Sequence, residues 1–457
     1  MSATHILVLP YPAQGHVIPL MQLSHELVKH GIKITFVNTD FNHKQIMKAL
    51  AAKGEEVRSE IRLTSIPDGL EDGISRNCLE MLTESICQVM PKELEMLIKE
   101  INQSDSVKIS CVVADVSMAW ALEVAEKMGI QRVAFWPASA SLLALSLSIQ
   151  KLLDDGIIDT DGTPTKDQII QLSSKMPLMR TEHFVWAQIG EDLKAQKIVF
   201  NYMRSNNKAM QVAHWVICNS TSELEPSAFA YAPEILPIGP LLSSKGNHFG
   251  NLEGSFWPED STCLNWLDQQ PDNSVIYIAF GSFTVFDLTQ LQELALGLEL
   301  SNKPFLWVVR SDVNNGENYA FLKAFEDRLF PRGKVVGWAP QQQVLHHPSV
   351  ACFLSHCGWN STIEGVTNGV PFLCWPYFAD QFLNETYICD IWMVGLSLNR
   401  KDGIIRRQEI TYKIKQVLHD EGFKTRALAL KERAINSVKE GGMSNQNFKN
   451  FVDWIRA

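Results

Sequence analysis

The first half of the chain alternates two patterns of hydrophobic and polar positions. Short unbroken apolar runs are typical of strands that are covered on both faces. Such runs occupy residues 5–10, 32–38, 61–67, 109–115 and 132–137. Between them lie stretches with helical spacing, such as residues 20–30 and 118–129. This order predicts βαβ units and a parallel sheet, and therefore an α/β fold.

The same alternation starts again after residues 241–260, a stretch rich in Gly, Ser and Asn that predicts a linker. The later apolar runs occupy residues 274–282, 305–310, 334–338, 351–357 and 371–376. The pattern predicts two doubly wound domains, residues 1–240 and 261–440, followed by an amphipathic helix at residues 441–457. Ligands bind at the carboxyl ends of the strands in such sheets, so we expect one cleft between the domains.

Composition and charge narrow the class of protein. The chain has 457 residues, 46% of them hydrophobic and 20% charged, as in ordinary globular proteins. A net charge of −10 without a basic stripe argues against nucleic-acid binding and favours small-molecule partners. We expect neither a signal peptide nor a membrane span, because no apolar stretch of the sequence fits either one. Several of its nine cysteines lie inside apolar runs. We expect a cytoplasmic protein without a membrane span, and a monomer.

Two common phosphate-binding motifs are missing from the sequence. Neither GxxxxGK[ST] nor GxGxxG occurs, which argues against a P-loop ATPase and against an ordinary nicotinamide oxidoreductase. Asp159 and Asp161 form an acid pair that could bind a metal, but they lie in a polar loop with no strand before it. We interpret them as loop residues and expect neither a metal nor a cofactor.

Residues 338–381 contain the most informative pattern. A strand, a tight turn around Gly358 and the start of a helix follow one another, and backbone N–H groups in such a position form an anion site. Asn360 and Ser361 add side-chain donors, and His356 adds another at the end of the strand.

Other residues of this stretch allow two interpretations. Trp338 either offers a flat face for a base or packs in the core. Glu364 either contacts a ligand or closes a capping box with Ser361. Asp380 and Gln381 are either ligand contacts or polar residues of a first helical turn. Because each lies where a strand ends and a helix begins, their combination favours a nucleotide-sugar site.

His16 and Asp115 form a second candidate constellation, and each follows an apolar run. An imidazole can take a proton from a hydroxyl near pH 7, and a buried carboxylate would hold it in one tautomer. The structural alternative is that His16 begins a helix and Asp115 caps the next one. The residues alone leave both interpretations open.

The stretch from Trp338 to Gln381 resembles the signature box of plant small-molecule UDP-sugar glycosyltransferases, with "WAPQ" at its start, "HCGWNS" inside and "DQ" at its end. The similarity extends through the chain, with "PYPAQGH" at residues 10–16, "VVAD" at 112–115 and "FGS" at 280–282. The family implies the GT-B fold, in which two Rossmann-like domains face a cleft. By this resemblance the first domain binds the acceptor, the second binds the UDP-sugar, and the C-terminal helix returns to the first domain.

The resemblance also implies roles for individual residues. It assigns donor binding to Ser282, Trp338, Ala339, Gln341, His356, Trp359, Asn360, Ser361, Glu364, Asp380 and Gln381. Trp338 would stack on uracil beside the Ala339 backbone, and Gln341 and Glu364 would hold the ribose. His356, Asn360 and Ser361, with Ser282, would hold the diphosphate. The helix N-terminus and His356 would neutralise its charge. The Trp359 backbone, Asp380 and Gln381 would hold the sugar hydroxyls, and the closing Gln381 implies UDP-glucose.

By the same resemblance His16 is the general base and Asp115 its partner, in an inverting, metal-independent transfer of glucose to a hydroxyl. One departure is Pro137, which stands where many relatives carry a hydroxyl residue that touches the sugar. Here that contact is absent, or comes from Ser139 or Ser141.

The sequence does not identify the acceptor. Aromatic and Met residues in the loops at about 68–90 and 175–205 indicate an apolar aglycone, such as a flavonoid, another phenolic or a terpenoid of plant secondary metabolism. Two alternatives remain open: a non-catalytic UDP-sugar-binding protein, and a UDP-sugar epimerase or hydrolase of the same fold.

Overall fold

A computed structural model of the protein describes residues 4–51, 60–188, 193–241, 254–310 and 317–457. The chain divides into two compact units. The first unit comprises residues 1–257 and 436–457, and the second comprises residues 258–435. Most of the linker expected at residues 241–260 lies outside the described residues.

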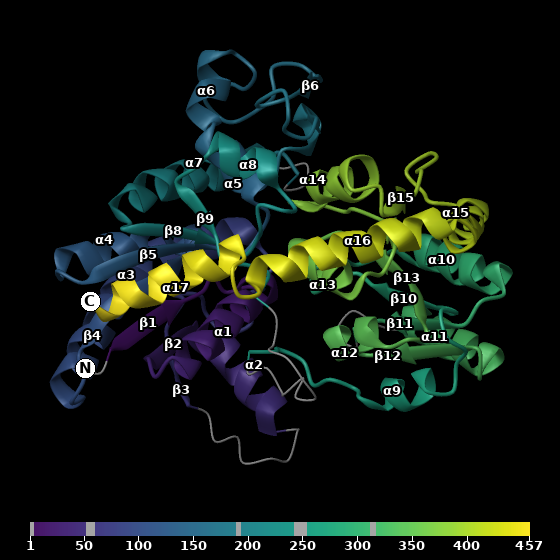
Figure 1. The fold of residues 1–457 in the computed structure, drawn as a ribbon, viewed down its shortest axis with the longest axis horizontal. Helices are drawn as coiled ribbons and strands as arrows, with labels where there is room; N and C mark the ends of the chain where they lie inside the picture. The colour runs from purple at the N-terminus through teal and green to yellow at the C-terminus, as the bar shows by residue number, and fades with distance from the viewer. Residues whose placement is uncertain (1–3, 52–59, 189–192, 242–253, 311–316) are drawn as a thin grey trace. The chain divides into compact units, whose positions relative to one another are not determined.

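A seven-stranded parallel sheet forms the centre of the first unit (Figure 1). Its strands are β1 (His5–Leu9), β2 (Lys33–Thr39), β3 (Ile61–Ile66), β4 (Ile109–Asp115), β5 (Gln131–Trp136), β8 (Trp215–Cys218) and β9 (Ile235–Pro237). They lie in the order β3-β2-β1-β4-β5-β8-β9. The first five strands coincide with the apolar runs of the sequence, so the α/β prediction is confirmed.

Helices connect these strands. They are α1 (Gln14–Lys29), α2 (Asp40–Ala51), α3 (Leu79–Ser104), α4 (Trp120–Lys127), α5 (Ala140–Leu147), α6 (Ile149–Asp154), α7 (Leu193–Ala209), α8 (Pro226–Tyr231) and the C-terminal α17 (Met443–Arg456). Three short 3-10 turns are η1 (Val116–Met118), η2 (Thr181–His183) and η3 (Met210–Val212). A small antiparallel pair, β6 (Ile169–Ile170) and β7 (Met179–Arg180), lies outside the main sheet.

The second unit repeats the architecture around a six-stranded parallel sheet of order β12-β11-β10-β13-β14-β15. Its strands are β10 (Val275–Ala279), β11 (Phe305–Val308), β12 (Gly333–Val336), β13 (Val350–Ser355), β14 (Phe372–Cys374) and β15 (Gly395–Ser397). Its helices are α9 (Thr262–Leu267), α10 (Leu288–Ser301), α11 (Glu317–Leu329), α12 (Gln341–His346), α13 (Trp359–Asn368), α14 (Gln381–Thr386), a π-helical turn η5 (Tyr387–Ile391), α15 (Arg407–His419) and most of α16 (Glu421–Val438).

In both sheets the strand order reverses at one position. In the first sheet the chain moves outward from β1 to β2 and β3, and then returns to β4 on the other side of β1. In the second sheet the same reversal lies between β10 and β13. The segments that follow these strands diverge and leave space at the carboxyl edge, which is where open α/β sheets bind ligands.

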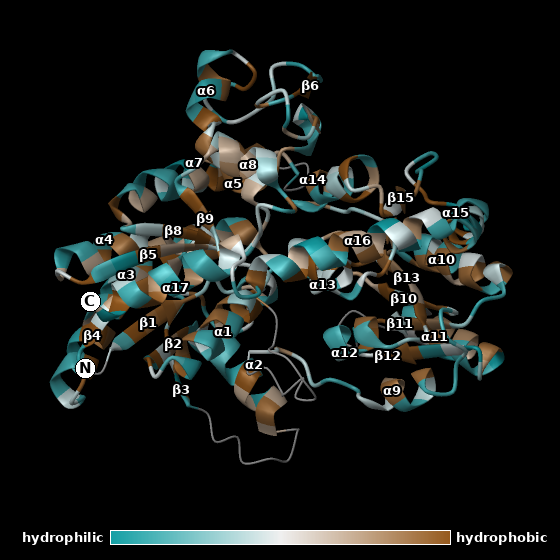
Figure 2. Ribbon diagram, in the orientation of Figure 1, coloured by the Kyte–Doolittle hydropathy of each residue, from teal (hydrophilic) through white to brown (hydrophobic). Residues whose placement is uncertain are grey.

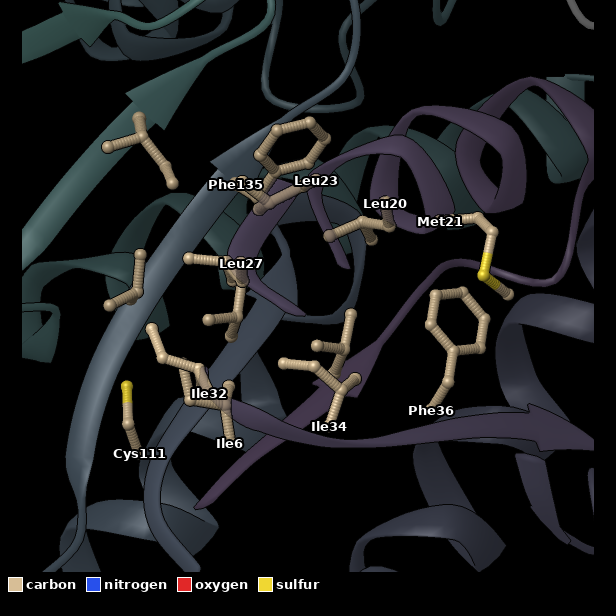
Figure 3. Packing of buried hydrophobic residues seen from close by; sticks show 14 of the residues in the cluster. Ile6, Leu20, Met21, Leu23, Leu27, Ile32, Ile34, Phe36, Cys111 and Phe135 are labelled. Atoms are coloured by element: carbon tan, nitrogen blue, oxygen red, sulfur yellow. The ribbon is translucent and has the colours of Figure 1, made fainter. Parts of the chain in front are cut away.

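The core of the first unit explains why α1 and α17 are helices. Apolar residues of α1 at helical spacing, such as Leu20, Leu23 and Leu27, pack on Ile6 and Phe36 of the sheet (Figure 3). The C-terminal α17 adds to the same core through Phe451, Val452 and Ile455. In Figure 2, β1 is hydrophobic along its length, whereas the helices carry both polar and apolar residues.

One strand differs from its predicted environment. The run at residues 61–67 was expected to be covered on both faces, but β3 is an edge strand. Its Arg62 is exposed and the next three residues are half-buried. An edge strand has a neighbour on one side alone, which leaves its polar residues open to solvent.

Candidate active site

The first candidate constellation lies where β1 and β4 reach their carboxyl ends. His16 stands in the first turn of α1, shortly after β1, and Asp115 is the last residue of β4. The two strands are parallel neighbours, with Leu9 opposite Ala114. This pairing brings His16 Nδ1 to 2.7 Å from Asp115 Oδ2. The strand reversal therefore joins two residues that are far apart in the sequence.

The surroundings of this pair define which atom is basic. Asp115 is completely buried, and its Oδ1 accepts a hydrogen bond from Ser117 N at 2.8 Å. A carboxylate only accepts, so His16 Nδ1 donates the shared hydrogen, and in the neutral imidazole Nε2 is the basic nitrogen. The His16 side chain is 27% exposed, so the imidazole is accessible. This is the arrangement required of a general base and the carboxylate that orients it.

The structural interpretation of Asp115 holds at the same time. Its Oδ1 caps η1, the turn before α4, while Oδ2 binds His16. Each oxygen performs one task, so capping and orientation are compatible. His16 has no capping role, because Ala13 is the N-cap of α1.

Two tyrosines lie beside the pair and its turn. The ring of Tyr11 is 5.1 Å from the His16 ring, between centroids. Tyr202 of α7 donates a hydrogen bond from its hydroxyl to the Ser117 carbonyl. Burial raises the pKa of both phenols above the ordinary value, so they remain protonated and act as apolar walls and donors.

In the second unit, the turn between β13 and α13 carries the predicted anion motif. Cys357 has a φ of +65°, which non-glycine residues rarely adopt, and its N–H donates to Ser355 Oγ at 3.1 Å. Gly358 is the N-cap of α13 and brings no side chain to the helix N-terminus. A strained turn that leads directly into a helix N-terminus fits an anion-binding role.

His356 lies against two glycines of this site. A Cβ added at Gly281, just after β10, would stand 2.7 Å from His356 Nε2, and one at Gly358 would stand 2.5 Å from it. Glycine at both positions leaves room for the imidazole. The contact also brings the Gly281–Ser282 segment next to the α13 turn, so two segments predicted to hold the diphosphate meet.

Burial lowers the pKa of His356 to about 4. The imidazole is therefore neutral near pH 7 in the ligand-free protein, because the buried ring loses the hydration that would stabilise its charge. A neutral imidazole can still donate an N–H to a phosphate oxygen, and the neutralisation of the diphosphate by His356 stays a prediction.

The residues predicted to hold the ribose form one hydrogen-bond network. Gln341 Nε2 donates to Ser361 Oγ at 2.8 Å and to Glu364 Oε2 at 2.7 Å. Tyr277 of β10 donates to Gln341 Oε1 at 3.0 Å, which fixes the orientation of this amide. Gln342 Nε2 donates to the other Glu364 oxygen at 3.2 Å. Glu364 therefore joins α13 to α12 instead of closing a capping box, and burial raises the pKa of its carboxyl.

Local hydrogen bonds also fix the end of the stretch from Trp338 to Gln381. Asp380 Oδ2 accepts from Trp359 N at 3.2 Å and from Asn384 Nδ2 at 2.7 Å. Gln381 is buried, and its Oε1 accepts from Tyr377 N at 2.7 Å and Phe378 N at 3.1 Å. The amide oxygen is thus committed to the loop, and the Gln381 NH2 group is what can donate to a ligand hydroxyl.

Trp338 and Ala339 follow β12 and precede α12. Trp338 is half-buried and does not belong to the core cluster of the second unit, which disfavours the core interpretation. Its carbonyl accepts from Asp260 N at 2.8 Å, so the backbone beside the indole is fixed. Ala339 is buried.

The serines near Pro137 are turned into the first unit. Ser139 and Ser141 are completely buried, and Ser139 Oγ accepts from Leu142 N as the N-cap of α5. Ala140 N and Ser141 N both donate to the buried Glu225. With no exposed surface, neither hydroxyl can replace the sugar contact that Pro137 lacks.

The aromatic residues in the second predicted acceptor loop, at about 175–205, pack on one another. Trp186 and Phe200 are fully buried, and the Trp186 ring lies 4.9 Å from Phe184 and 5.5 Å from Phe200. Trp186 Nε1 donates to the Gly162 carbonyl at 2.8 Å. These three side chains stabilise a local core, so they give no support to the prediction of an apolar acceptor. The acceptor class itself stays a prediction.

The acid pair at residues 159–161 has structural partners. Asp159 Oδ1 accepts from Asp161 N at 2.9 Å and from Thr163 N at 2.8 Å, which closes a polar turn. Asp161 pairs with Lys197 at 2.9 Å. Among the described residues, no group of His, Cys, Asp and Glu side chains is arranged to hold a metal ion.

Comparison with known proteins identifies the class to which this fold and these sites belong. The family model of UDP-glucoronosyl and UDP-glucosyl transferases matches residues 257–435. UDP-glycosyltransferase 83A1 of Arabidopsis thaliana is 48% identical over 465 residues, which cover 100% of this chain and 98% of that protein. The chain therefore belongs to the UDP-glycosyltransferase family.

Two solved structures support the same assignment and confirm the GT-B fold. Os79 from O. sativa in complex with UDP matches with a TM-score of 0.81 and 26% identity, over 98% of this chain and 100% of that one. A UDP-glucosyltransferase from Polygonum tinctorium matches with a TM-score of 0.82 and 26% identity, over 100% and 99% of the two chains. No helix in the described part of the chain is both long and apolar enough to cross a bilayer.

The sequence did not point to two residues that support the site. Tyr277 lies inside an apolar run, and only the folded sheet shows that its hydroxyl reaches Gln341. Asn384 anchors both Asp380 and the Cys357 carbonyl, the latter at 2.8 Å. Its position four residues after Asp380 on a helix was a signal that could have found it.

Proposed function

We propose that this protein transfers glucose from UDP-glucose to a hydroxyl of a small apolar acceptor, with inversion at the anomeric carbon. The observation that carries the proposal is the His16–Asp115 hydrogen bond of 2.7 Å at the strand reversal of the first unit. His16 Nε2 takes the acceptor proton, and Asp115 stabilises the resulting imidazolium. The acceptor oxygen attacks the anomeric carbon as UDP leaves, and an attack opposite the leaving group inverts the configuration.

The donor site is proposed in the second unit, at the carboxyl ends of β12, β10 and β13. Trp338 stacks on uracil, and the Gln341–Glu364 network accepts the ribose hydroxyls. The α13 N-terminus, His356 and Ser282 hold the diphosphate through N–H and O–H donors. The Gln381 NH2 group supports the assignment of glucose, since it can donate to a sugar hydroxyl.

The acceptor is proposed to be a small ring-bearing aglycone, and the enzyme to act in the cytoplasm as a monomer. Support for the acceptor comes from Tyr11 beside His16 and from the Polygonum tinctorium relative, which is described as capable of glucosylating indoxyl. Screening phenols and terpenoid alcohols with UDP-glucose, and identifying the products by mass spectrometry, would identify the acceptor.

Replacing His16 with alanine tests the mechanism. We expect kcat to fall by about 10²–10⁴-fold, the usual contribution of a positioned general base, while UDP affinity and Tm stay near wild type. Asp115→Asn should lower kcat as well, and the double variant should be little worse than the poorer single one, because the two residues act as a unit. His25→Ala on the same helix is the matched control and should keep full activity.

Near-normal turnover of His16→Ala with a lowered Tm would make His16 structural and overturn the mechanism. Release of free glucose without any glycoside in the acceptor screen would indicate a hydrolase, and a changed UDP-sugar would indicate an epimerase.

Metal independence is a separate expectation of the proposal. The diphosphate donors named above are N–H and O–H groups, so turnover should persist in excess EDTA. Steady-state rates with and without chelator measure this. Loss of turnover that Mn²⁺ restores would show that a metal ion performs this task.

A further inference from the structure

Three cysteine side chains of the second unit meet next to the turn between β13 and α13. Cys357 belongs to that turn, Cys374 is the last residue of β14, and Cys389 lies in the π-helical turn η5. The Sγ atoms of Cys374 and Cys389 are 3.7 Å apart, and the Cys374 thiol also forms a hydrogen bond with the Cys357 thiol. The mechanism proposed above uses none of these thiols. Such a cluster either fills the core or is a site of oxidation.

Cys389 is the accessible member of the cluster. Cys357 and Cys374 are completely buried, whereas Cys389 is half-buried. It stands in a π-helical turn, a rare conformation that is frequent at functional sites. A reagent from solution can therefore reach the Cys389 sulfur, and Cys374 is in contact with it as a second thiol. These are the two features of a cysteine pair that forms a disulfide on oxidation.

A hydroxyl and a carboxyl give the Cys389 proton a path away from the sulfur. Ser397 Oγ donates a hydrogen bond to Cys389 Sγ at 3.5 Å, and Ser397 is also hydrogen-bonded to Glu385. Burial raises the pKa of Glu385 to about 7, so both protonation states of this carboxyl are populated near neutral pH. A proton can pass from Cys389 through Ser397 to Glu385. The thiolate that remains is the reactive form of cysteine.

The separation of Cys374 and Cys389 allows a disulfide after a small movement. An S–S bond is about 2.05 Å long, so the two sulfur atoms must approach by about 1.7 Å from their distance of 3.7 Å. Cys374 is held in place because β14 pairs with β13 on one side and with β15 on the other. The movement therefore falls on η5 and on the side-chain torsions of the two cysteines.

Cys357 connects this thiol pair to the proposed diphosphate site. Its φ of +65° is a conformation that non-glycine residues rarely adopt, and such a residue persists only where its surroundings hold it. Its carbonyl accepts from Asn384 Nδ2 at 2.8 Å, and its thiol is hydrogen-bonded to Cys374. A disulfide removes the hydrogen of Cys374 and turns its sulfur toward Cys389. We expect the turn at Cys357 to shift as a result, together with the N-terminus of α13.

We propose that Cys374 and Cys389 are a modification site at which hydrogen peroxide forms a disulfide, and that the oxidised protein binds UDP more weakly. The second part rests on the proposed donor site. The Cys389 sulfur attacks one peroxide oxygen, so an S–O bond forms, the O–O bond breaks and water leaves. The Cys374 sulfur then attacks the Cys389 sulfur, the S–S bond forms, and the hydroxyl leaves as a second water with the remaining thiol proton. The two thiols lose two electrons, and one peroxide is reduced to two water molecules.

Treatment of the whole protein with hydrogen peroxide tests the modification. Peptide mass spectrometry without reduction should find Cys374 and Cys389 in one linked pair that has lost two hydrogen atoms, and iodoacetamide should no longer label Cys389. Cys389→Ser cannot form this bond, and Cys389→Ala is a second variant in case serine disturbs the fold. Cys87→Ser is the matched control, because Cys87 is an exposed cysteine of the first unit, and it should form the disulfide as wild type does.

Titration calorimetry with UDP tests the effect on the donor site. Peroxide should weaken UDP binding by wild type and by Cys87→Ser about tenfold, the usual effect of losing one hydrogen bond to a charged group. Dithiothreitol should restore the affinity, because it reduces the disulfide. Cys389→Ser should bind UDP equally well before and after peroxide.

The outcomes separate the two parts of the inference. Oxidation of Cys389 to a sulfinic acid without a linked peptide overturns the modification site, and so does an unchanged Cys389 at a peroxide dose that oxidises Cys87. A linked peptide with unchanged UDP affinity overturns the effect on the donor site, as does an equal loss of affinity in Cys389→Ser. If reduced wild type does not bind UDP, the proposed donor site fails and the second part fails with it, while the linked peptide still decides the first.

Discussion

Carboxylates organise both candidate sites by accepting N–H groups. Asp115 accepts from Ser117 N and His16, and Asp380 accepts from Trp359 N and Asn384. A carboxylate has no proton to donate, so each of these contacts fixes which partner carries the hydrogen. Replacing such a residue by its amide would place an NH2 group against an N–H and disturb the neighbouring ligand group.

At Glu385 of α14, the effect of burial on the pKa of the carboxyl is larger than the opposite effect of its hydrogen bond. Burial raises its pKa to about 7 from an ordinary value of 4.5, although Ser397 lowers it in part. Between these two values the folded protein keeps a proton that the unfolded chain has lost. The stabilising effect of this proton is complete below about pH 4.5 and is lost as the pH rises through about 7.

Replacing Glu385 with glutamine should therefore raise the Tm at pH 8 and change it little at pH 5. The amide is neutral at every pH, so the variant avoids the cost of a buried charge. Thermal unfolding of both proteins between pH 5 and 8 measures the difference. Glu440→Gln, at an exposed position on the surface, is the control and should show no such trend. An equal Tm shift at both pH values would contradict the pKa assignment.

At the scale of elements, the turn between β13 and α13 depends on the missing side chain of Gly358. This residue has a φ of −59° and a ψ of 144°, which alanine also adopts. A Cβ there would stand 2.5 Å from His356 Nε2, so the obstacle is the imidazole and not the backbone. A change at this position therefore tests the role of His356 without removing it.

Gly358→Ala should displace the His356 ring and weaken UDP binding by about tenfold or more, as expected when a charge-assisted hydrogen bond is lost. Gly337→Ala is the matched control, because a Cβ at Gly337 meets no atom within 4 Å. Titration calorimetry of both variants with UDP compares them. Wild-type affinity of Gly358→Ala would show that the imidazole does not contact the diphosphate.

The elements that the sequence predicted well are those with a local signature. Strands such as β1 and β4 are buried on both faces and are therefore unbroken apolar runs. Short strands gave no such signal: β15 has three residues and begins with Gly395. The aromatic residues around Trp186 were assigned to the wrong environment, because composition does not show whether a ring faces a ligand or another ring.

The candidate sites also contain some contacts that a local sequence pattern predicts and others that it does not. Residues of one turn, such as His356 and Gly358, lie close together because they are close in the chain. The His16–Asp115 pair required knowledge of strand order, which places β1 beside β4. The Tyr277–Gln341 hydrogen bond depends on side-chain packing across elements, and no local pattern encodes it.

At the scale of the whole molecule, the two units hold different chemistry. The candidate base lies in the first unit, at the strand reversal of its sheet. The predicted donor residues lie in the second unit, and some of them flank the reversal between β10 and β13. The last helix, α17, belongs to the first unit, because its residues Phe451, Val452 and Ile455 are part of the hydrophobic core of that unit. A change in α17 should therefore affect the unit of the candidate base and not that of the donor.

Phe451→Ala tests this division. Phe451 is completely buried, and its ring lies 5.8 Å from that of Trp215 on β8. Its truncation leaves a cavity that should lower the free energy of unfolding of the first unit by about 3–5 kcal/mol. UDP affinity below the unfolding transition should stay at the wild-type value, because the predicted donor residues belong to the second unit. Lys449→Ala, on the same helix but exposed, should change neither quantity. Calorimetric unfolding and UDP titration on the same samples measure both.

A loss of UDP affinity in Phe451→Ala at a temperature where the protein is still folded would mean that α17 supports the donor site, and the assignment of one function to each unit would fail.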